Sequence, residues 1–167
     1  MILTLCGMMG VGKTTVGVKL AALTGAKWVD TDTVIEEKYG KITDIFSRYG
    51  EEYFRSLETE TVKSLCGEHR LILSVGGGLV LRKENVDCLK NNGKIVYLRA
   101  KQDTLVRRLQ GDATRPLLQG EDLENRIGKL LQTRGDIYAG VADYAVDVDD
   151  KTPEQIASEI LSLVGGV

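Results

Sequence analysis

The chain has 167 residues, of which 43% are hydrophobic and 28% are charged; these fractions are typical of one globular domain and disfavour an intrinsically disordered or membrane-embedded chain. Its 22 basic and 24 acidic residues give a net charge of −2, which disfavours a broad, positively charged surface that binds nucleic acid or an anionic membrane. The N-terminus shows no signal sequence and no apolar stretch of membrane-spanning length, so we expect neither a nucleic-acid nor a membrane partner.

Short apolar runs alternate with longer amphipathic stretches along the chain. The short runs are rich in β-branched or aromatic residues and predict strands at 2–6, 27–30, 71–75, 95–98 and 144–148. The amphipathic stretches predict helices at 14–23, 33–39, 51–65, 84–91, 103–109, 121–138 and 153–163. Strands that alternate with helices predict an α/β fold, with a five-stranded parallel sheet between two helical layers.

Two segments interrupt this alternation. Residues 32–67 hold more helix than one crossover between neighbouring strands needs, and they predict an inserted helical subdomain. Residues 111–120, with the sequence GDATRPLLQG, are bounded by glycines and contain a proline, which is typical of a lid over an active site. No linker divides the chain, so we expect one domain over residues 1–167.

A phosphate-binding motif follows the first predicted strand. Residues 7–14 read GMMGVGKT, a full match to GxxxxGK[ST] with a strand before it and a helix after it. Its glycines let backbone N–H groups point at phosphate oxygens, Lys13 can reach the β- and γ-phosphates, and the Thr14 hydroxyl can ligate Mg²⁺. A glycine-rich turn without a ligand is the alternative. The predicted nucleotide-binding residues are Gly10, Val11, Gly12, Lys13, Thr14 and Thr15.

The second predicted strand ends in two aspartates, Asp30 and Asp32. Carboxyl ends of parallel strands line the ligand crevice, and alternate residues of an extended segment point the same way, so both carboxylates can face the phosphates. Mg²⁺ is the natural partner for Asp30, directly or through water. Asp32 can accept a hydrogen bond from a substrate hydroxyl. Alternatively, Asp32 or Thr31 only caps the following helix.

A cation and a glycine run complete the candidate site. Arg55 and Glu58 are i, i+3 neighbours on a predicted helix, so the carboxylate can orient the guanidinium; a solvated surface pair is the alternative. The third strand leads into Gly76, Gly77 and Gly78, where bare backbone can approach a ligand, unless these residues form a plain tight turn.

The motifs of the chain are, in order, GMMGVGKT, VDTD, FRSLE, SVGGG, RPLL at 115–118, and Arg134 with Tyr138. In both the order and the spacing of these motifs, the chain resembles the shikimate kinase family over nearly its whole length. The resemblance implies a fold like that of nucleoside monophosphate kinases, and transfer of the ATP γ-phosphoryl to the 3-hydroxyl of shikimate, a step of aromatic amino acid biosynthesis. The implied shikimate-binding residues are Asp32, Arg55, Gly76, Gly77, Gly78 and Arg134. It further implies that Arg115 approaches the phosphates from the lid and that Arg108 lies by the adenine. The family commonly has proline where this chain has Asp136.

The implied chemistry agrees with these residue types. Shikimate has one carboxylate and three hydroxyls, so Arg55 and Arg134 suit the acid, whereas Asp32 and the Gly77 backbone suit the hydroxyls as acceptors. We expect Lys13, Asp32 and Arg115 to be catalytic, Asp32 orienting the attacking hydroxyl or accepting its proton. Thr14 and Asp30 are the expected magnesium ligands. The cofactors are therefore Mg²⁺ and the co-substrate ATP.

Two other functions remain open at the level of sequence. One is a kinase of the same fold that acts on gluconate or a nucleoside monophosphate; the other is a non-catalytic nucleotide-binding module. The three cysteines, Cys6, Cys66 and Cys88, are odd in number and contain no CxxC pair, so we expect no disulfide framework and no zinc site. A monomer in the reducing cytoplasm is the expected form.

Overall fold

The sheet is fully parallel and places the first strand at its centre. The computed structural model describes residues 1–110 and 122–167. The five strands lie in the order β2-β3-β1-β4-β5. Their bounds are β1 Ile2–Cys6, β2 Lys27–Asp30, β3 Leu71–Ser74, β4 Gly93–Arg99 and β5 Tyr144–Asp147. The predicted five-stranded parallel sheet is therefore confirmed.

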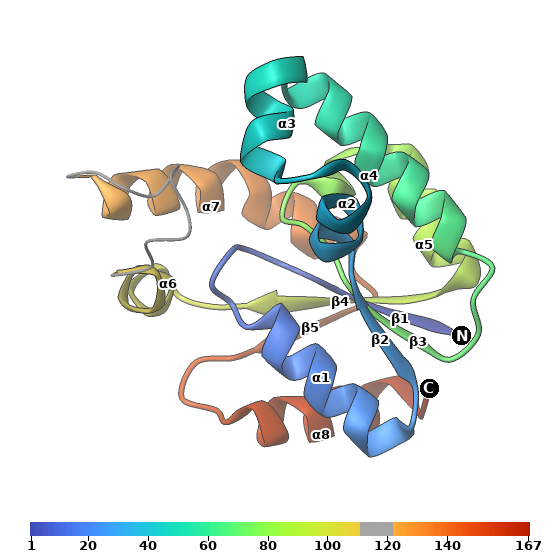
Figure 1. Cartoon of the computed structure of the whole chain (residues 1–167). Coiled ribbons are helices and arrows are strands. Elements are labelled where there is room, and N and C mark those ends of the chain that lie inside the picture. Colours follow the sequence, from blue (N-terminus) through green and yellow to red (C-terminus); the bar gives the residue numbers. More distant parts are fainter. Residues whose placement is uncertain (111–121) are drawn as a thin grey trace.

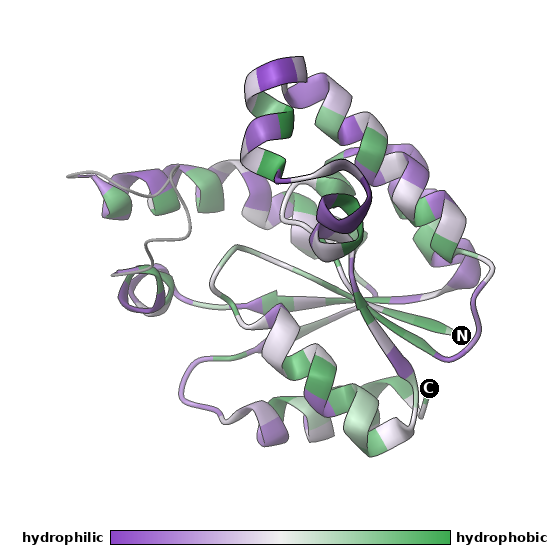
Figure 2. Cartoon of the chain, in the orientation of Figure 1, coloured by the Kyte–Doolittle hydropathy of each residue, from purple (hydrophilic) through white to green (hydrophobic). Residues whose placement is uncertain are grey.

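Helices cover both faces of the sheet (Figure 1). On one face lie α1 and α8, which contact each other, and on the other lie α4, α5 and α7. The helical elements are α1 Lys13–Thr24, α2 Thr31–Tyr39, α3 Ile42–Tyr49, α4 Glu51–Leu65, the 3₁₀ turn η1 Leu79–Leu81, α5 Lys83–Asn92, α6 Gln102–Leu109, α7 Leu123–Val141 and α8 Pro153–Val164. The central strands β1 and β3 are largely hydrophobic, β2 and β4 carry charged residues at their ends, and the helices turn hydrophilic residues outward (Figure 2).

Burial on both faces explains the strand sequences. All residues of β1 and β3 are buried, so these strands read as continuous apolar runs rather than as alternating ones. The start of the last helix, α8, is stabilised by a capping box. The Thr152 side chain accepts from the Gln155 amide, and the Gln155 side chain accepts from the Thr152 amide.

The segment between β2 and β3 has an apolar cluster of its own. Ile35 of α2, Ile45 of α3 and both Phe54 and Leu57 of α4 are buried together, apart from the main core. Helix α3 was not expected from the sequence, because its eight residues lie between Gly40 and Gly50 and carry only one buried side chain, that of Ile45. These helices stand over the carboxyl ends of β2 and β3 (Figure 1).

Two cysteines are paired, contrary to the expectation that no disulfide forms. Cys66, at the end of α4, is bonded to Cys88 of α5, with their Cα atoms 6.6 Å apart. The prediction was wrong because the packing of α4 against α5 brings together residues 22 positions apart, and no local spacing motif signals such a pair. Cys6 is buried and free, and burial raises the pKa of its thiol to about 12.

No helix within residues 1–110 and 122–167 combines the length and the apolar character that a membrane crossing requires.

Candidate active site

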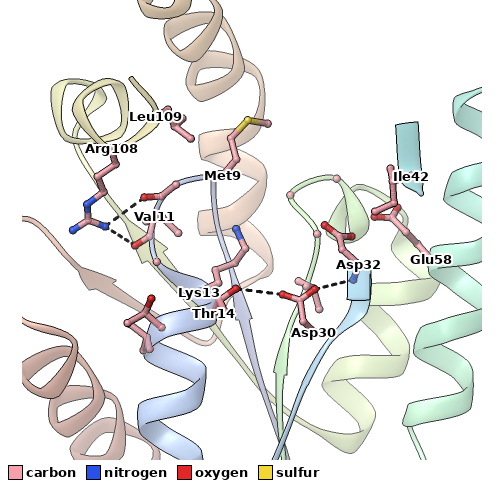
Figure 3. Close-up of a pocket in the computed structure, with 18 of the residues that line it drawn as sticks. Met9, Val11, Lys13, Thr14, Asp30, Asp32, Ile42, Glu58, Arg108 and Leu109 are labelled. Carbon is pink, nitrogen blue, oxygen red and sulfur yellow. Dashed lines mark hydrogen bonds between the residues drawn. The ribbon is translucent and has the colours of Figure 1, made fainter. Parts of the chain in front are cut away.

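A large cavity lies over the carboxyl ends of β1, β2 and β3 (Figure 3). Its volume is about 1020 Å³. It brings together the loop before α1, the start of α2, one face of α4, the glycine run after β3 and part of α7. The lining includes these predicted site residues: Gly10, Val11, Gly12, Lys13, Thr14, Thr15, Asp30, Asp32, Arg55, Gly76, Gly77, Gly78, Arg108 and Arg134. Arg115 and the predicted lid at 111–120 lie outside the described residues.

The loop between β1 and α1 has the form expected of a phosphate cradle. Gly10 and Gly12 have φ angles of 79° and 100°, in the left-handed region that side chains rarely adopt. Lys13 Nζ donates to the carbonyl oxygens of Gly7 and Met8 at 2.8 and 2.9 Å, so the ammonium group lies across the loop. Backbone amides at the start of α1 and this ammonium group together favour a polyphosphate.

Arg108, near the end of α6, contacts the same loop. Its Nη1 donates to Val11 O at 2.9 Å and to Gly10 O at 3.4 Å (Figure 3). The guanidinium group is therefore not simply exposed to solvent at the end of a helix. It holds the outer side of the phosphate loop and lines the cavity.

Asp30 is shared between a helix cap and the phosphate site. Its Oδ1 accepts from the amides of Asp32 and Thr33 at 2.9 and 3.2 Å, which makes Asp30 the N-cap of α2. Its Oδ2 accepts from the Thr14 hydroxyl at 3.4 Å. The alternative in which Asp32 or Thr31 caps the helix is therefore wrong; the cap lies one or two residues earlier.

The pair of Thr14 and Asp30 suits a magnesium ion. A hydroxyl and a carboxylate oxygen 3.4 Å apart are hard oxygen donors beside the phosphate loop. Residues 1–110 and 122–167 contain no cluster of three or more His, Cys, Asp or Glu side chains that could hold a metal. This part of the chain thus offers few ligands of its own, which agrees with an ion that keeps waters and binds substrate phosphates.

Asp32 lies in the first turn of α2 rather than on an extended strand. The prediction that Asp30 and Asp32 alternate along an extended segment is therefore wrong, although both aspartates do line the cavity. The helix turns the Asp32 carboxylate toward the glycine run, where a Cβ on Gly76 would lie 2.8 Å from its Oδ1. Thr31, beside it, accepts a hydrogen bond from the Gly76 amide at 3.1 Å and so joins the start of α2 to the glycine run.

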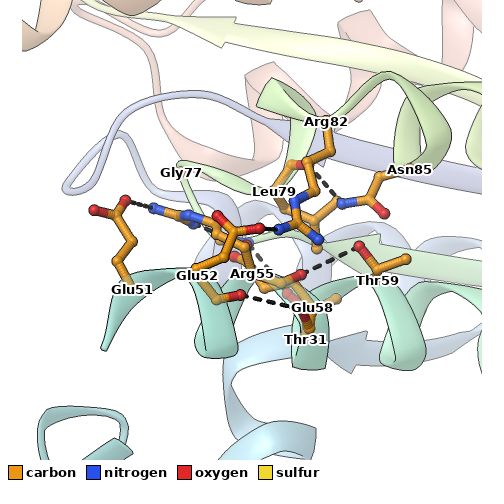
Figure 4. A network of polar contacts seen from close by, with 12 residues as sticks. Thr31, Glu51, Glu52, Arg55, Glu58, Thr59, Gly77, Leu79, Arg82 and Asn85 are labelled. Carbon is orange, nitrogen blue, oxygen red and sulfur yellow. Dashed lines mark hydrogen bonds and ion pairs between the residues drawn. The ribbon is translucent and has the colours of Figure 1, made fainter. Parts of the chain in front are cut away.

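The Arg55–Glu58 pair is buried rather than solvated. Arg55 Nη1 donates to Glu58 Oε2 at 2.8 Å, and its Nη2 donates to Glu51 Oε1 at 3.1 Å (Figure 4). The Glu58 side chain is 1% exposed and that of Arg55 13%. Burial raises the pKa of Glu58, with Arg55 opposing the shift. For Arg55, burial lowers the pKa, but the hydrogen bonds to its two glutamates outweigh it, so the guanidinium stays charged.

Gly76 and Gly78 make room for polar side chains, whereas Gly77 has ordinary contacts with α7. A Cβ on Gly76 would crowd Asp32 and Glu58, and a Cβ on Gly78 would overlap the Arg55 guanidinium. Gly77 faces α7, with the Tyr138 hydroxyl and Arg134 Nη1 lying 3.4 and 3.5 Å from its Cβ position. The run does form a tight turn, in which the Leu79 amide donates to Gly76 O at 3.1 Å, and the turn also packs closely against the polar side chains around it.

The Gly77 backbone serves differently from what the sequence suggested. Its carbonyl oxygen accepts a hydrogen bond from the Tyr138 hydroxyl at 2.6 Å. Within the described residues, the amides of Gly77 and Gly78 donate no hydrogen bond to the protein, and both residues line the cavity. Gly77 therefore offers the ligand a donor rather than the acceptor that we expected.

Sequence reasoning missed one further contact beneath the phosphate loop. Ser74 Oγ, at the end of β3, donates to the Lys13 carbonyl at 3.0 Å and accepts from Trp28 Nε1 at 3.1 Å. This bridge fixes the first residue of α1 to the sheet. A Cβ on Gly17 of α1 would lie only 2.5 Å from Trp28 Nε1, so the close approach depends on that glycine. A serine before a glycine run gives no signal of such a role.

Comparison with known proteins gives one consistent result. The sequence matches the family model for shikimate kinase over residues 9–164. A curated shikimate kinase from Thermodesulfovibrio yellowstonii is 43% identical over 160 residues, covering 95% of this chain and 92% of that protein. A second, from Caldanaerobacter subterraneus, is 41% identical over 160 residues and covers 95% and 93%. The solved structure of shikimate kinase from Acinetobacter baumannii in complex with shikimate is similar with a TM-score of 0.92 and 38% identity, covering 98% of this chain and 92% of that one.

Proposed function

The chain belongs to the shikimate kinase family, and on that premise we propose that ATP binds at the phosphate loop while shikimate binds between α2, α4, α7 and the glycine run. Like its relatives, the protein is an ATP-dependent kinase that works with Mg²⁺. It transfers the γ-phosphoryl group of ATP to the 3-hydroxyl of shikimate and yields shikimate 3-phosphate and ADP.

One observation carries the assignment of the acceptor end: an arginine held rigidly by a buried carboxylate opens onto the same cavity as the phosphate loop. Arg55 and Arg134 approach the glycine run from different helices, which suits a small acid that both can bind. The Asp32 carboxylate and the Gly77 amide suit the hydroxyls at the other end. These contacts support shikimate over an acceptor without a carboxylate.

The phosphoryl transfer requires mainly alignment and positive charge. Lys13 and the amides at the start of α1 hold the phosphate chain, and Arg108 holds the loop that carries them. Thr14 and Asp30 would hold Mg²⁺, which when bound neutralises charge on the phosphate oxygens. Asp32 orients the attacking hydroxyl and takes its proton as the new phosphate ester bond forms. Arg115 remains a prediction from the sequence for the role of a further phosphate-binding cation.

Coupled release of ADP in the presence of Mg²⁺ tests the function directly. We expect release to depend on shikimate, and gluconate and nucleoside monophosphates to give no more than the rate without acceptor. A protein that bound ATP but released no ADP with shikimate would instead be a nucleotide-binding module. Omission of Mg²⁺, by excess chelator, should abolish the rate and its return should restore it.

We propose a monomer as the working form of the protein. A requirement for ATP as co-substrate supports a location in the cytoplasm, where ATP is made. Light scattering on the purified protein tests the first point: a mass of a single chain is expected at assay concentrations.

A further inference from the structure

Tyr138 is a fully buried tyrosine whose hydroxyl reaches the glycine run beside the cavity. It lies on α7 with 0% of its surface exposed, and its ring packs against Tyr97 of β4 at a centroid distance of 5.3 Å. Its hydroxyl donates to Gly77 O at 2.6 Å. Apolar packing alone would be served equally by phenylalanine, and a buried hydroxyl is costly without a partner. The hydroxyl therefore calls for an explanation beyond packing.

The hydrogen bond fixes one peptide group of the glycine run. In a trans peptide the carbonyl and the following N–H point in opposite directions, so anchoring Gly77 O also sets the direction of the Gly78 amide. Neither the Gly77 nor the Gly78 amide donates to protein within the described residues. Gly76 is anchored separately, since its amide donates to Thr31 Oγ1 and its carbonyl oxygen accepts from the Leu79 amide, each at 3.1 Å. The bond to Tyr138 acts on the next peptide group, between Gly77 and Gly78, two residues with wide conformational freedom.

The same helix carries the arginine proposed to bind the substrate acid. Arg134 precedes Tyr138 by four residues, about one helical turn, and its Nη1 lies 3.5 Å from the Cβ position of Gly77. The helix α7 runs without interruption from Leu123 to Val141, through Asp136, where the family commonly has proline. Burial raises the pKa of Tyr138 to about 12, with Arg134 opposing the shift, so the hydroxyl remains a donor at neutral pH.

We propose that Tyr138 is a positioning residue for shikimate: its hydroxyl locks the Gly77–Gly78 peptide to α7, and so holds the amides of the glycine run and the Arg134 guanidinium at a fixed spacing. The inference rests on the proposed binding of shikimate at Arg134 and Gly77. It predicts that loss of the hydroxyl weakens the binding of shikimate, while the binding of ATP at the loop before α1 is unaffected.

Removal of single hydroxyl groups tests the proposal. Tyr138→Phe keeps the ring and should raise the KM for shikimate roughly three- to tenfold, as expected for one lost hydrogen bond, with the KM for ATP unchanged within about twofold. Tyr97→Phe is the matched control, since it removes a hydroxyl from the ring that packs on Tyr138 but spares the bond to Gly77. Its KM for shikimate should equal that of the wild type.

The outcomes separate the inference from its premise. Arg134→Lys tests the premise: an unchanged KM for shikimate would show that the acid binds elsewhere. If Arg134→Lys raises that KM but Tyr138→Phe does not, or raises both KM values equally, the positioning role is wrong. The amide resonance of Gly78 in ¹⁵N-labelled protein gives a readout independent of activity. It should shift or broaden in Tyr138→Phe and stay in place in Tyr97→Phe; an unmoved resonance in Tyr138→Phe would overturn the proposal.

Discussion

At the scale of single residues, the glycine run decides how closely the polar side chains of the cavity approach one another. Asp32, Glu58 and Arg55 come from two helices, yet all three reach positions that a Cβ on Gly76 or Gly78 would fill. The glycines were interpreted from sequence as a place where backbone meets ligand. They also admit the side chains that the ligand needs, which no pattern along the chain could reveal.

Gly78→Ala should therefore weaken the binding of shikimate through Arg55 alone. The φ and ψ angles of Gly78, −98° and −6°, are accessible to alanine, so backbone strain does not contribute. The new methyl group would overlap the Arg55 guanidinium. We expect the KM for shikimate to rise by about tenfold or more, since small displacements of binding groups are costly.

Gly140→Ala is the control for this substitution. Gly140 lies near the end of α7, and no heavy atom lies within 4 Å of its Cβ position. The control should keep the wild-type KM and gain about 0.5–1 kcal/mol of stability, because alanine favours a helix over glycine. A Gly78→Ala enzyme with the KM of the control would show that Arg55 does not depend on this space.

Glu58→Gln should separate the charge of this side chain from its size. Glutamine can still accept a hydrogen bond from Arg55, but it cannot balance the guanidinium charge, so we expect the KM for shikimate to rise several-fold, by the order of one charge-assisted hydrogen bond. The KM for ATP should not change. Glu51→Gln, which alters the exposed partner of the same arginine, should have a smaller effect.

The same variant should alter the dependence of stability on pH. Burial raises the pKa of Glu58 in the folded protein above its ordinary value of 4.5, so the folded state binds this proton more tightly than the unfolded state. The contribution of Glu58 to stability is therefore greatest below pH 4.5 and is lost as the pH rises through the raised pKa. Urea unfolding between pH 4.5 and 7 should show this loss in the wild type and not in Glu58→Gln. Parallel curves for the two proteins would contradict the assignment.

At the scale of elements, sequence patterns predicted what depends on burial and on local spacing. The five strands, the phosphate loop and α4 were predicted because continuous apolar runs and the GxxxxGK[ST] spacing are local signals. The geometry at the start of α2 was not predicted correctly. Whether Asp30 or Asp32 caps the helix depends on where the chain turns after β2, and that is set by Thr14 and Gly76, which are remote in sequence.

The disulfide between α4 and α5 should affect stability rather than the binding of either substrate. It closes a segment of 22 residues that contains β3, the glycine run and η1. Closing a loop of this length stabilises a fold by about 3 kcal/mol in the chain-entropy account. A reductant should therefore lower the urea midpoint of the wild type.

Cys88→Ser, which cannot form the bond, provides the control. Its midpoint should be the same with and without reductant. Titration of the denatured, unreduced wild type should find one thiol, that of Cys6. Three thiols, or a wild-type midpoint that ignores the reductant, would show that Cys66 and Cys88 are not joined.

In the whole molecule, the parallel sheet brings the two halves of the site to the edge formed by the carboxyl ends of its strands. One half is the phosphate loop, and the other is the acceptor side, where shikimate is proposed to bind. The phosphate loop follows β1, the capping Asp30 ends β2, and the glycine run follows β3, so three neighbouring strands deliver the parts of one cavity. Figure 1 shows α2, α3 and α4 above this edge, where they carry the acceptor side of the site. Contacts of Thr14 with Asp30 and of Thr31 with Gly76 join the two sides.

This division predicts that catalysis and the binding of shikimate can be lost separately. Lys13→Met removes the ammonium group that lies across the phosphate loop, where it donates to the carbonyl oxygens of Gly7 and Met8. Shikimate-dependent release of ADP should fall by about a hundredfold or more, as for the loss of one electrostatic contact in a transition state. The rise in melting temperature on addition of shikimate should remain.

Arg55→Lys should show the converse, with a reduced shift in melting temperature for shikimate and a retained shift for ATP, because lysine cannot reproduce the two-pronged hydrogen bonding of the guanidinium group. If Lys13→Met instead abolished the shift for shikimate, the two halves of the site would be one cooperative unit, and the separation of roles between β1 and the helices above β2 and β3 would be wrong.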